Sequence, residues 1–566
     1  MAGTTPPAQA QQSSCSKPKQ HQQEMKPRKS INLLRGWPST SLLPAEGLRA
    51  ASQTALSDPA VFDLGLQYGP DHGYQPLREE LGRWLGRFYH PHIRDDGEGG
   101  NGGVDADRIA ITGGASQSIA CILQSFTDPS YTRAVWMVAP CYFLACPIFA
   151  DAGFERRLRA VPEDEEGIDL GFLEDGLRKM AAAESDEGDG ESAGGQGKGE
   201  GEGEDQEKGQ RRRYKDPGPH RKIYRHVIYC VPSFSNPSGK TMSLRRRQGL
   251  VRLAREHDAL VICDDVYDML QWPVSAACPS SPSPSTPSPS SSPSSSTTAT
   301  PDVNSLTTAL LPRLADLDIP LGRSPHDPSG QHFGHTVSNG SFSKLVAPGV
   351  RTGWTYSTPA FATGISQTGS TRSGGAPSQL TATILCEILC GGAVERHVVE
   401  VLRPAYQRRH KVLMDASERV LTPLGVRVRE GSLCGRGDVF GGFFVWMSFP
   451  SEDSSTSSSE TMDMDRKTEN GKERTHWPSA KAVADRCSSD EDLMIGWGGL
   501  FEVHGDEAAV RFERDVRLCF AYEDEAHLVE GVERLGRVIG RMLEEGPGGW
   551  EGTEKGKGQG DVAQIK

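Results

Sequence analysis

Short apolar runs alternate along the chain with segments in which apolar residues recur at helical spacing. Three runs have the length of buried strands: residues 134–139 (AVWMVA), 226–231 (HVIYCV) and 259–263 (ALVIC). Residues 250–257, between the last two runs, have helical character. Strands that alternate with helices are typical of α/β proteins, in which helices cover a mostly parallel sheet. The pattern therefore predicts an α/β fold.

A single apolar stripe stands out near the C-terminus. Its residues recur at helical spacing and predict one buried face of an amphipathic helix. No apolar stretch approaches the ~18 residues that a membrane-spanning helix needs. The stripe consists of Leu528, Val532, Leu535, Ile539 and Met542.

Three segments have compositions that cannot form a core. Residues 184–220 are rich in Gly, Glu, Lys and Asp, residues 278–300 are a Pro/Ser run, and residues 451–476 are rich in Ser, Glu, Asp and Lys. We interpret them as surface inserts. A stable core tolerates such inserts, because each doubling of loop length costs only ~0.6 kcal/mol. Residues 1–30 lack the apolar region of a secretory signal, and we interpret them and residues 546–566 as disordered tails.

Composition narrows the partners of the chain. The sequence has 62 Lys+Arg against 75 Asp+Glu, a net charge of −13, which disfavours binding to nucleic acids or anionic membranes. Its 12 cysteines show no metal-ligand or disulfide spacing, and several, such as Cys141 and Cys263, lie in apolar runs. We therefore expect a cytoplasmic protein without a metal site, a nucleic-acid partner or a membrane partner.

Residues 338–354, SNGSFSKLVAPGVRTGW, contain several candidate functional residues. Small and apolar residues surround Lys344, and partial desolvation would leave a fraction of its amine neutral and able to attack a carbonyl group. Arg351 and the hydroxyl groups of Ser341 and Ser343 could donate hydrogen bonds to a dianionic phosphate.

This stretch resembles the cofactor-lysine motif of the class I/II aminotransferases, the fold-type-I pyridoxal-phosphate enzymes. In that motif SFSK is followed by PG, one residue, R and GW, as it is here. The resemblance runs from about residue 31 to about residue 543, interrupted by the inserts. It implies pyridoxal 5′-phosphate as the cofactor and Lys344 as its covalent attachment.

The resemblance also implies an architecture. We expect a large domain with a mostly parallel seven-stranded sheet flanked by helices, and a small α+β domain formed by both chain ends. The expected boundaries are 31–80 for the N-terminal segment of the small domain, 81–400 for the large cofactor-binding domain and 401–545 for the C-terminal small domain.

A second motif is ALVICDDVY, residues 259–267, which places Asp264 at the C-terminal end of a strand, where α/β proteins bind ligands. Taken alone, Asp264 and Asp265 would most simply cap a helix. The resemblance assigns Asp264 to the pyridine nitrogen, where a carboxylate keeps the ring protonated and electron-accepting, and Tyr267 to the ring hydroxyl. Asp265 is expected to cap the helix or to face away.

Two turns complete the expected cofactor site. In VPSFSNPSGK, Asn236 stands in a turn sequence, and the resemblance assigns it to the ring hydroxyl and to the substrate pocket. In ITGGASQSI, small residues open a helix, whose first N–H groups form an anion site. The resemblance assigns Ala115, Ser116 and Gln117 to the phosphate there.

Two tyrosines have family counterparts. Tyr142 follows the AVWMVA strand and is expected to stack on the cofactor ring, although simple core packing remains an alternative; Cys141 replaces the family's usual small hydroxyl residue. Tyr68, in LQYGPDHGYQPLR, matches a tyrosine that reaches the phosphate of the other subunit. It therefore implies a homodimer with shared active sites, and Ser373 is expected to make a similar contact.

Substrate contacts are expected from both chain ends. Arg517, in VRLCF, matches an arginine that binds the substrate α-carboxylate through its planar fork, although alone it could be an edge-strand charge. Gly36 and Trp37 match a segment that closes over the substrate, with Trp37 helping to select its side chain. No second arginine dedicated to a distal carboxylate is obvious, so a preference for dicarboxylic substrates stays open.

The function implied is a ping-pong transfer of an amino group from an amino acid to a 2-oxo acid. The surrounding details most resemble the branch with 2-aminoadipate and aromatic or kynurenine-type transaminases. The alternatives are another reaction on the same fold, such as C–S β-elimination or aminocyclopropane-carboxylate formation, a transcription regulator with an aminotransferase-like domain, and a non-enzymatic interaction protein. The regulator needs a DNA-binding domain, and only about 30 residues precede the expected catalytic region.

Overall fold

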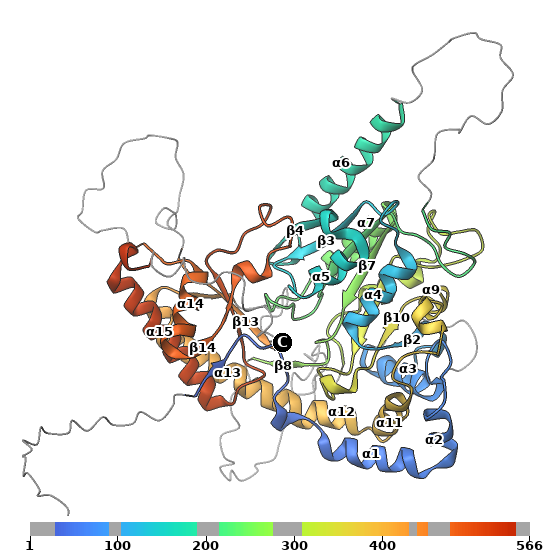
Figure 1. Ribbon diagram of the computed structural model, residues 1–566, viewed down its shortest axis with the longest axis horizontal. Coiled ribbons are helices and arrows are strands. Elements are labelled where there is room, and N and C mark those ends of the chain that lie inside the picture. Colours follow the sequence, from blue (N-terminus) through green and yellow to red (C-terminus); the bar gives the residue numbers. More distant parts are fainter. Residues whose placement is uncertain are drawn as a thin grey trace, which may run out of the picture.

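The computed structural model describes residues 29–89, 103–189, 214–274, 308–429, 439–450 and 476–550. The predicted insert at 278–300 and most of the other two inserts and of both tails lie outside these ranges. The described residues form a larger α/β part and a smaller part that contains most of the C-terminal elements (Figure 1).

The larger part is built on one eight-stranded sheet. Its order is β2-β10-β9-β7-β6-β3-β4-β5, and the strands are parallel except for β10 and β5, each antiparallel to its neighbours. The predicted α/β class with a mostly parallel sheet is confirmed. The eighth strand exceeds the seven expected, because the chain turns back after β4 and two residues pair with its end. The strands are β2 (Ile109–Thr112), β3 (Ala134–Ala139), β4 (Leu158–Asp164), β5 (Gly167–Ile168), β6 (His226–Cys230), β7 (Ala259–Asp264), β9 (Thr336–Ser341) and β10 (Gly353–Tyr356).

Both faces of this sheet are covered by helices, so the central strands are buried along their whole length. Alternate residues enter two separate apolar clusters, as the two-residue period of a strand requires. Trp136 and Val261 pack with α6 (Leu170–Asp189) and α7 (Leu244–Glu256) on one face. Val135 and Ile262 pack on the other face, with α4 (Ala115–Phe126), α5 (Ala145–Phe149) and α9 (Pro359–Ser366).

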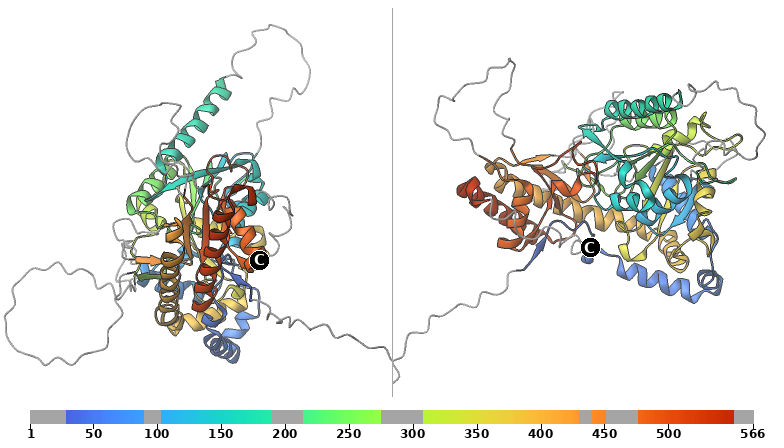
Figure 2. Two further views of the ribbon diagram at one scale, coloured as in Figure 1. Left: turned by 90° about the vertical axis from the view of Figure 1, so that its left-hand side faces the viewer. Right: turned by 45° about the horizontal axis from the view of Figure 1, so that its top comes forward.

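Helix α6 extends well beyond the edge of the sheet (Figure 2). Its last residues, 184–189, belong to the first predicted insert, which we expected to be a surface loop from residue 184 onwards. The helix continues because the preceding KMAAAE sequence is rich in good helix formers.

The smaller part is a four-stranded antiparallel sheet, in the order β11-β13-β16-β15, with helices packed on it. All five residues of the predicted apolar stripe are buried on α15, so the predicted amphipathic helix is confirmed. The elements are β11 (Arg427–Arg429), β13 (Phe444–Ser448), β15 (Gly496–Trp497), β16 (Asp515–Cys519), α13 (Arg403–Val420), α14 (Ala480–Glu491) and α15 (Glu525–Glu545).

The N-terminal segment divides between the two parts. Strand β1 (Ile31–Asn32) pairs in parallel with β14 (Leu493–Met494) of the smaller part. Helices α1 (Ala45–Ser57) and α2 (Pro59–Gly65) instead pack against α11 (Gln379–Cys390). Residues 31–80 therefore contact the small domain only at their beginning, and the domain limits stay a prediction. The remaining elements are α3 (Gln75–Tyr89), α8 (Leu314–Asp318), α10 (Gly369–Arg372), α12 (Ala393–His397), β8 (Gln271–Pro273) and β12 (Val439–Gly441).

Candidate functional site

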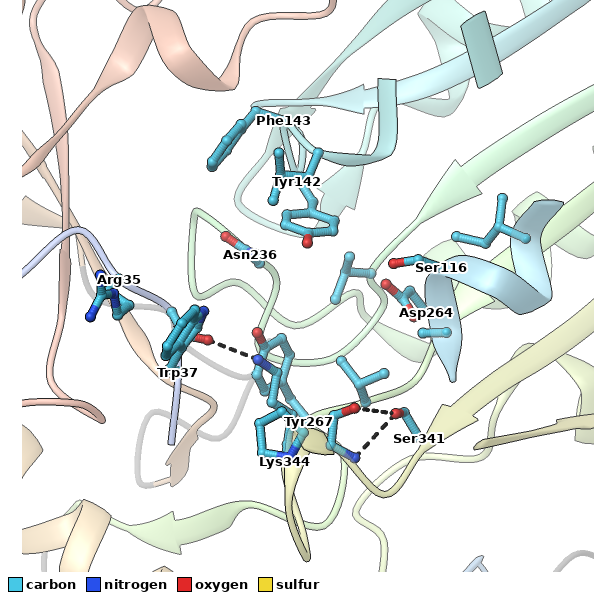
Figure 3. A pocket seen from close by; sticks show the side chains of 18 of the residues that line it. Arg35, Trp37, Ser116, Tyr142, Phe143, Asn236, Asp264, Tyr267, Ser341 and Lys344 are labelled. Carbon is cyan, nitrogen blue, oxygen red and sulfur yellow. Dashed lines mark hydrogen bonds between the residues drawn. The ribbon is translucent and has the colours of Figure 1, made fainter. Parts of the chain in front are cut away.

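A cavity of about 230 Å³ lies where the C-terminal ends of β7 and β6 face the loop of residues 34–37 and strand β16. Parallel α/β sheets place ligands at this edge, because the loops that follow the strands converge there. Figure 3 shows Lys344 and Tyr267 near its centre, Ser116 and Ser341 at one end, and Arg35 and Trp37 at the other.

Lys344 lies in the turn after β9, in the interior of the cavity. Its Nζ donates a 2.8 Å hydrogen bond to the carbonyl oxygen of Gly36 and lies 5.9 Å from the centroid of the Tyr267 ring. Burial lowers the pKa of Lys344 to about 8, although Asp264 nearby acts in the opposite direction. An appreciable fraction of the amine is therefore neutral near physiological pH.

Asp264 ends β7 as a buried carboxylate. The Tyr229 hydroxyl donates to its Oδ2 at 3.0 Å, and the Asn339 amide donates to its Oδ1 at 3.3 Å. Burial raises the pKa of Asp264 to about 6, while these two donors and the charge of Lys344 favour the ionised form. The group is thus mostly a carboxylate at neutral pH.

The roles of Tyr229 and Asn339 were not predicted from the sequence. Asn339 lies directly opposite Asp264 in the parallel pairing of β7 with β9, and Tyr229 lies on the neighbouring strand β6. The polar residue in the middle of a strand, just before SFSK, was the available signal for Asn339. Strand register was needed to connect either residue with Asp264.

One end of the cavity collects hydrogen-bond donors. Ala115 and Ser116 begin α4, whose first N–H groups have no carbonyl partner within the helix. Gly114 precedes them with φ 95°, and a Cβ atom there would lie 2.9 Å from Nη2 of Arg351, so a side chain would fill this space. Ser341 Oγ donates to Ser343 Oγ at 2.9 Å, and both residues line the cavity.

Arg351 closes this end from the turn after Lys344. Its Nη2 donates to the carbonyl oxygen of Gly113 at 3.1 Å, and its Nη1 donates to the carbonyl oxygen of Pro348 at 3.0 Å. These bonds fix the guanidinium beside the start of α4. Helix N–H groups, two hydroxyl groups and one guanidinium together suit a phosphate.

The structure does not bring Gln117 into the cavity. Its Oε1 accepts a 2.8 Å hydrogen bond from the Gly113 N–H, and its Nε2 donates to Cys121 Sγ at 2.9 Å. The side chain turns back because an unpaired N–H group of the preceding loop lies within reach. A direct phosphate contact by Gln117 has no support in this geometry.

Tyr68 also lies outside the cavity, and its expected role at the phosphate of another subunit stays a prediction. Its side chain is 89% exposed, just beyond the end of α2. A Cβ atom on Gly374 would lie 3.4 Å from the Tyr68 ring, so Tyr68 neighbours the segment that contains Ser373, which is itself exposed.

Arg517 of β16 and Asn236, after β6, meet in the cavity wall. Nη1 of Arg517 donates to Oδ1 of Asn236 at 2.7 Å, and Nη2 donates to the carbonyl oxygen of Leu34. The guanidinium lies 4.1 Å from the Phe444 ring centroid, and its Nε is buried without a hydrogen-bond partner. Burial lowers the pKa of Arg517 to about 10, so it stays a cation.

The remaining predicted residues also line the cavity. Tyr142 follows β3, and burial raises the pKa of its hydroxyl to about 12. Gly36 and Trp37 come from the N-terminal loop, as expected. Arg35 and Phe143 were not predicted from the sequence, although each is adjacent to a predicted site residue, and this adjacency could have indicated them. Further missed lining residues are Leu34, Ile119, Leu144, Val231, Val266 and Pro348.

Comparison with known sequences identifies relatives of the chain. The model of the family described as "Aminotransferase class I and II" matches residues 44–279. The Saccharomyces cerevisiae protein named "Uncharacterized protein YER152C" is 32% identical over 434 residues, which are 75% of this chain and 83% of that protein. Aromatic-amino-acid aminotransferase 1 of Thermococcus litoralis is 23% identical over 90% of this chain and 88% of its own length. The 2-aminoadipate transaminase of Thermus thermophilus is 23% identical over 90% and 89%.

Solved structures show the same fold. The multiple substrate aminotransferase of Thermococcus profundus superposes with a TM-score of 0.61 at 21% identity, over 91% of this chain and 92% of that chain. LysN, the α-aminoadipate aminotransferase of Thermus thermophilus, gives a TM-score of 0.58 at 23% identity, over 91% and 93%.

The fold is that of the fold-type-I pyridoxal-phosphate enzymes, with a lysine and an aspartate buried at the C-terminal edge of its main sheet. More particularly, the chain belongs to the class I and II aminotransferase family. Within the residues that the structure describes, none of the helices combines the length and apolarity needed to cross a membrane.

Proposed function

We propose that this aminotransferase uses Lys344 to attach pyridoxal 5′-phosphate and to transfer protons during the exchange of an amino group between an amino acid and a 2-oxo acid. The observation that carries the proposal is the buried Lys344 amine, with a pKa of about 8, in a cavity that Asp264 and Arg517 also line.

The cavity has the donors and acceptors that the cofactor needs. Arg351, Ser341, Ser343 and the first N–H groups of α4, at Ala115 and Ser116, would hold the phosphate. Space for it is left beside Gly114, where a Cβ atom would lie 2.9 Å from Arg351. When bound, the cofactor supplies an electron-accepting ring that stabilises negative charge at the substrate Cα.

Residues of the larger part would set the state of that ring. The Asp264 carboxylate would keep the ring nitrogen protonated, and Tyr229 and Asn339 orient the carboxylate for this task. Tyr142 would pack on a face of the ring. Asn236 and Tyr267 would share the ring hydroxyl and stabilise its anionic form.

Lys344 and Arg517 would act on the substrate. The neutral Nζ of Lys344 would take the α-proton and then return a proton, and its lowered pKa suits both steps. Arg517 would bind the substrate α-carboxylate, for which its unpartnered Nε supplies an available N–H. Asn236, bonded to Nη1, orients the guanidinium. Gly36 and Trp37 would cover the substrate and exclude water.

A homodimer is part of the proposal. Tyr68 and the neighbouring Leu64 and Leu66 are exposed by more than half of their surface, together with part of Leu380. Exposed apolar side chains gathered in this way favour burial by a second copy of the chain. Tyr68 of each subunit would then reach the phosphate of the other.

We further infer a cytoplasmic location and a role in amino-acid metabolism, within a biosynthetic process. Every cysteine in the described ranges is a free thiol, which suits a reducing compartment. The relatives named for 2-aminoadipate and aromatic amino acids support these two substrate classes as first candidates.

The test is a single half-reaction. Purified protein loaded with pyridoxal phosphate is mixed with each of a panel of amino acids, and loss of the absorbance of the lysine-bound cofactor is followed. Transamination predicts this loss together with formation of the matching 2-oxo acid. Lys344→Ala should abolish both, whereas Lys481→Ala, at an exposed lysine on α14, should not.

The same experiment tests the rival reactions. Release of pyruvate and ammonia without an added 2-oxo acid would instead identify a β-lyase, and release of a cyclic amino acid would identify aminocyclopropane-carboxylate formation. No absorbance change with any amino acid would contradict the proposed enzyme.

A further inference from the structure

Arg35 lies on a loop whose position is fixed relative to the catalytic lysine. Oδ1 of Asn32 accepts hydrogen bonds from the backbone N–H groups of Leu34 at 3.0 Å and Arg35 at 2.8 Å. The next carbonyl group, that of Gly36, accepts from Lys344 Nζ. The loop is thus held at both sides of Arg35, and its side chain lines the same cavity as Lys344.

Two aromatic rings hold the Arg35 guanidinium. Its Cζ lies 4.5 Å from the Trp37 ring centroid and 5.2 Å from the Tyr522 ring centroid, and Nη1 donates to the Tyr522 hydroxyl at 3.2 Å. The two rings meet edge to face at 89°. Contacts of this kind orient a guanidinium without using all of its five N–H donors.

The guanidinium has unused donors. Nε of Arg35 is buried without a hydrogen-bond partner, and no carboxylate of the described residues forms an ion pair with Arg35. A half-buried cation without a counter-ion is unfavourable, because its desolvation is not compensated. A ligand with a negative group would supply the compensation.

A charge inventory of the cavity points to the same conclusion. Its described lining contains four cations, Lys344, Arg351, Arg517 and Arg35, and one acid, Asp264. In the proposed function Arg351 faces the phosphate, Arg517 the α-carboxylate, and Asp264 and Lys344 the cofactor ring. Arg35 remains without an anionic partner, at the end of the cavity remote from Ser116 and Ser341 (Figure 3).

We propose that Arg35 is a specificity-determining residue that binds a second carboxylate, at the far end of a dicarboxylic amino acid or 2-oxo acid. The proposal rests on the proposed transamination and selects the dicarboxylic class from its two candidate substrate classes. Trp37 and Phe143, which line the cavity, would contact the methylene groups between the two carboxylates. Arg35 thereby provides the distal arginine that was not obvious in the sequence.

The first experiment compares substrates that differ only in the distal charge. Half-reaction rates of the holoenzyme are measured with glutamate against glutamine, and with 2-aminoadipate against norleucine, for wild type, Arg35→Met and Arg35→Lys. Arg35→Met should lower kcat/KM for the two acids by on the order of 10- to 100-fold, the usual effect of losing a charge-assisted hydrogen bond. The neutral substrates should keep their rates. For the two acids, kcat/KM of Arg35→Lys should lie between the values of wild type and Arg35→Met, because an ammonium group lacks the planar, two-pronged geometry of a guanidinium.

The matched control is Arg49→Met on α1, an exposed arginine that pairs with Glu46 and does not line the cavity. It should leave all four rates unchanged. A readout independent of turnover is calorimetric binding of glutarate and pentanoate to the holoenzyme. Wild type should bind glutarate more tightly, and Arg35→Met should remove that difference.

The outcomes separate the two proposals. If wild type exchanges amino groups but Arg35→Met lowers the rates for acidic and neutral substrates equally, Arg35 only shapes the loop and this inference is wrong. The inference is also wrong if no dicarboxylic substrate reacts or if glutarate binding is unchanged in Arg35→Met. If wild type gives no half-reaction with any amino acid, the proposed function itself has failed.

Discussion

Nη1 of Arg517 and Oδ1 of Asn236 form a 2.7 Å hydrogen bond that joins β16 of the smaller part to the loop after β6 of the larger part. The two residues are 281 positions apart in the sequence. This contact fixes an arginine that lines the cavity and whose Nε has no hydrogen-bond partner. The proposed carboxylate site therefore depends on the relative position of both parts.

Arg517→Lys tests that site. A lysine keeps the charge but cannot donate to Asn236, to Leu34 and to a carboxylate in the same planar geometry. We expect kcat/KM for amino acids to fall by on the order of 100-fold, with most of the loss in KM, measured in single half-reactions. Arg511→Lys, at an exposed arginine that pairs with Glu513, is the control. A rate close to that of wild type in Arg517→Lys would remove Arg517 from the carboxylate site.

Asp264→Asn should change how the stability of the cofactor-free protein depends on pH. Burial raises the pKa of Asp264 from 3.8 to about 6, so the folded state binds its proton more tightly than the unfolded state does. Ionisation of Asp264 therefore lowers the free energy of unfolding progressively as the pH rises from about 4 to about 6. Above that range the loss is constant. From the size of the shift, this cost is on the order of 2–3 kcal/mol.

The measurement is thermal unfolding of the cofactor-free variants. Asp264→Asn should raise the melting temperature at pH 8 and have little effect at pH 4, whereas Asp175→Asn, at an exposed aspartate on α6, should do neither. The cofactor-loaded Asp264→Asn variant should nevertheless lose much of its half-reaction rate, because an amide does not keep the ring nitrogen protonated. A stabilisation of equal size at both pH values would contradict the assigned pKa.

Arg247 should support the loop that carries Asn236. Its fully buried guanidinium donates to the carbonyl oxygens of Pro232 at 3.0 Å and Met242 at 3.1 Å, on the two sides of Asn236. Arg247→Met would remove both bonds, and the Pro232 oxygen alone would keep another donor, the Met242 N–H at 2.7 Å, so we expect a loss of ~3 kcal/mol in the free energy of unfolding. Denaturant unfolding measures it, with Arg252→Met on the exposed face of the same helix as the control. A loss of unfolding free energy no larger than that of the control would show that the loop with Asn236 does not depend on Arg247.

Mixing two damaged proteins tests the shared active site. Lys344→Ala lacks the lysine of its own cavity, and Tyr68→Phe lacks the hydroxyl expected at the other subunit's phosphate. A hybrid dimer would contain one site with both intact residues, so activity should reappear when the two variants are refolded together. Separate samples should stay impaired. The absence of any gain would contradict the shared site, provided that hybrid dimers are detected by mass.

Much of the cavity was accessible from the sequence because its chemistry is local. Asp264 ends a strand, Lys344 and Asn236 lie in the loops that follow strands, and the structure brings all three together. What could not be predicted depends on contacts between distant segments. The partnership of Asp264 with Tyr229 needs strand order, and the stacking of Arg35 on Tyr522 needs the packing of the two chain ends.

Gln117 shows a different limit. Its place in the helix was correctly predicted, since α4 begins at Ala115. The orientation of its side chain was decided by an unpaired N–H group four residues earlier, which competes with any ligand for the amide oxygen. Periodicity assigns a residue to a helix, but it does not show which of several acceptors and donors a flexible side chain will choose.

The hydrogen bond from Lys344 to Gly36 also links the two parts of the structure. Gly36 continues from β1, which is paired with the smaller part, whereas Lys344 belongs to the larger part, so one amine ties the two parts together across the cavity mouth. A covalent bond to this amine would remove the hydrogen bond to Gly36. In the proposed function the cofactor would occupy this amine, so Gly36 would lose the bond from Lys344 while Leu34 keeps its bond from Arg517.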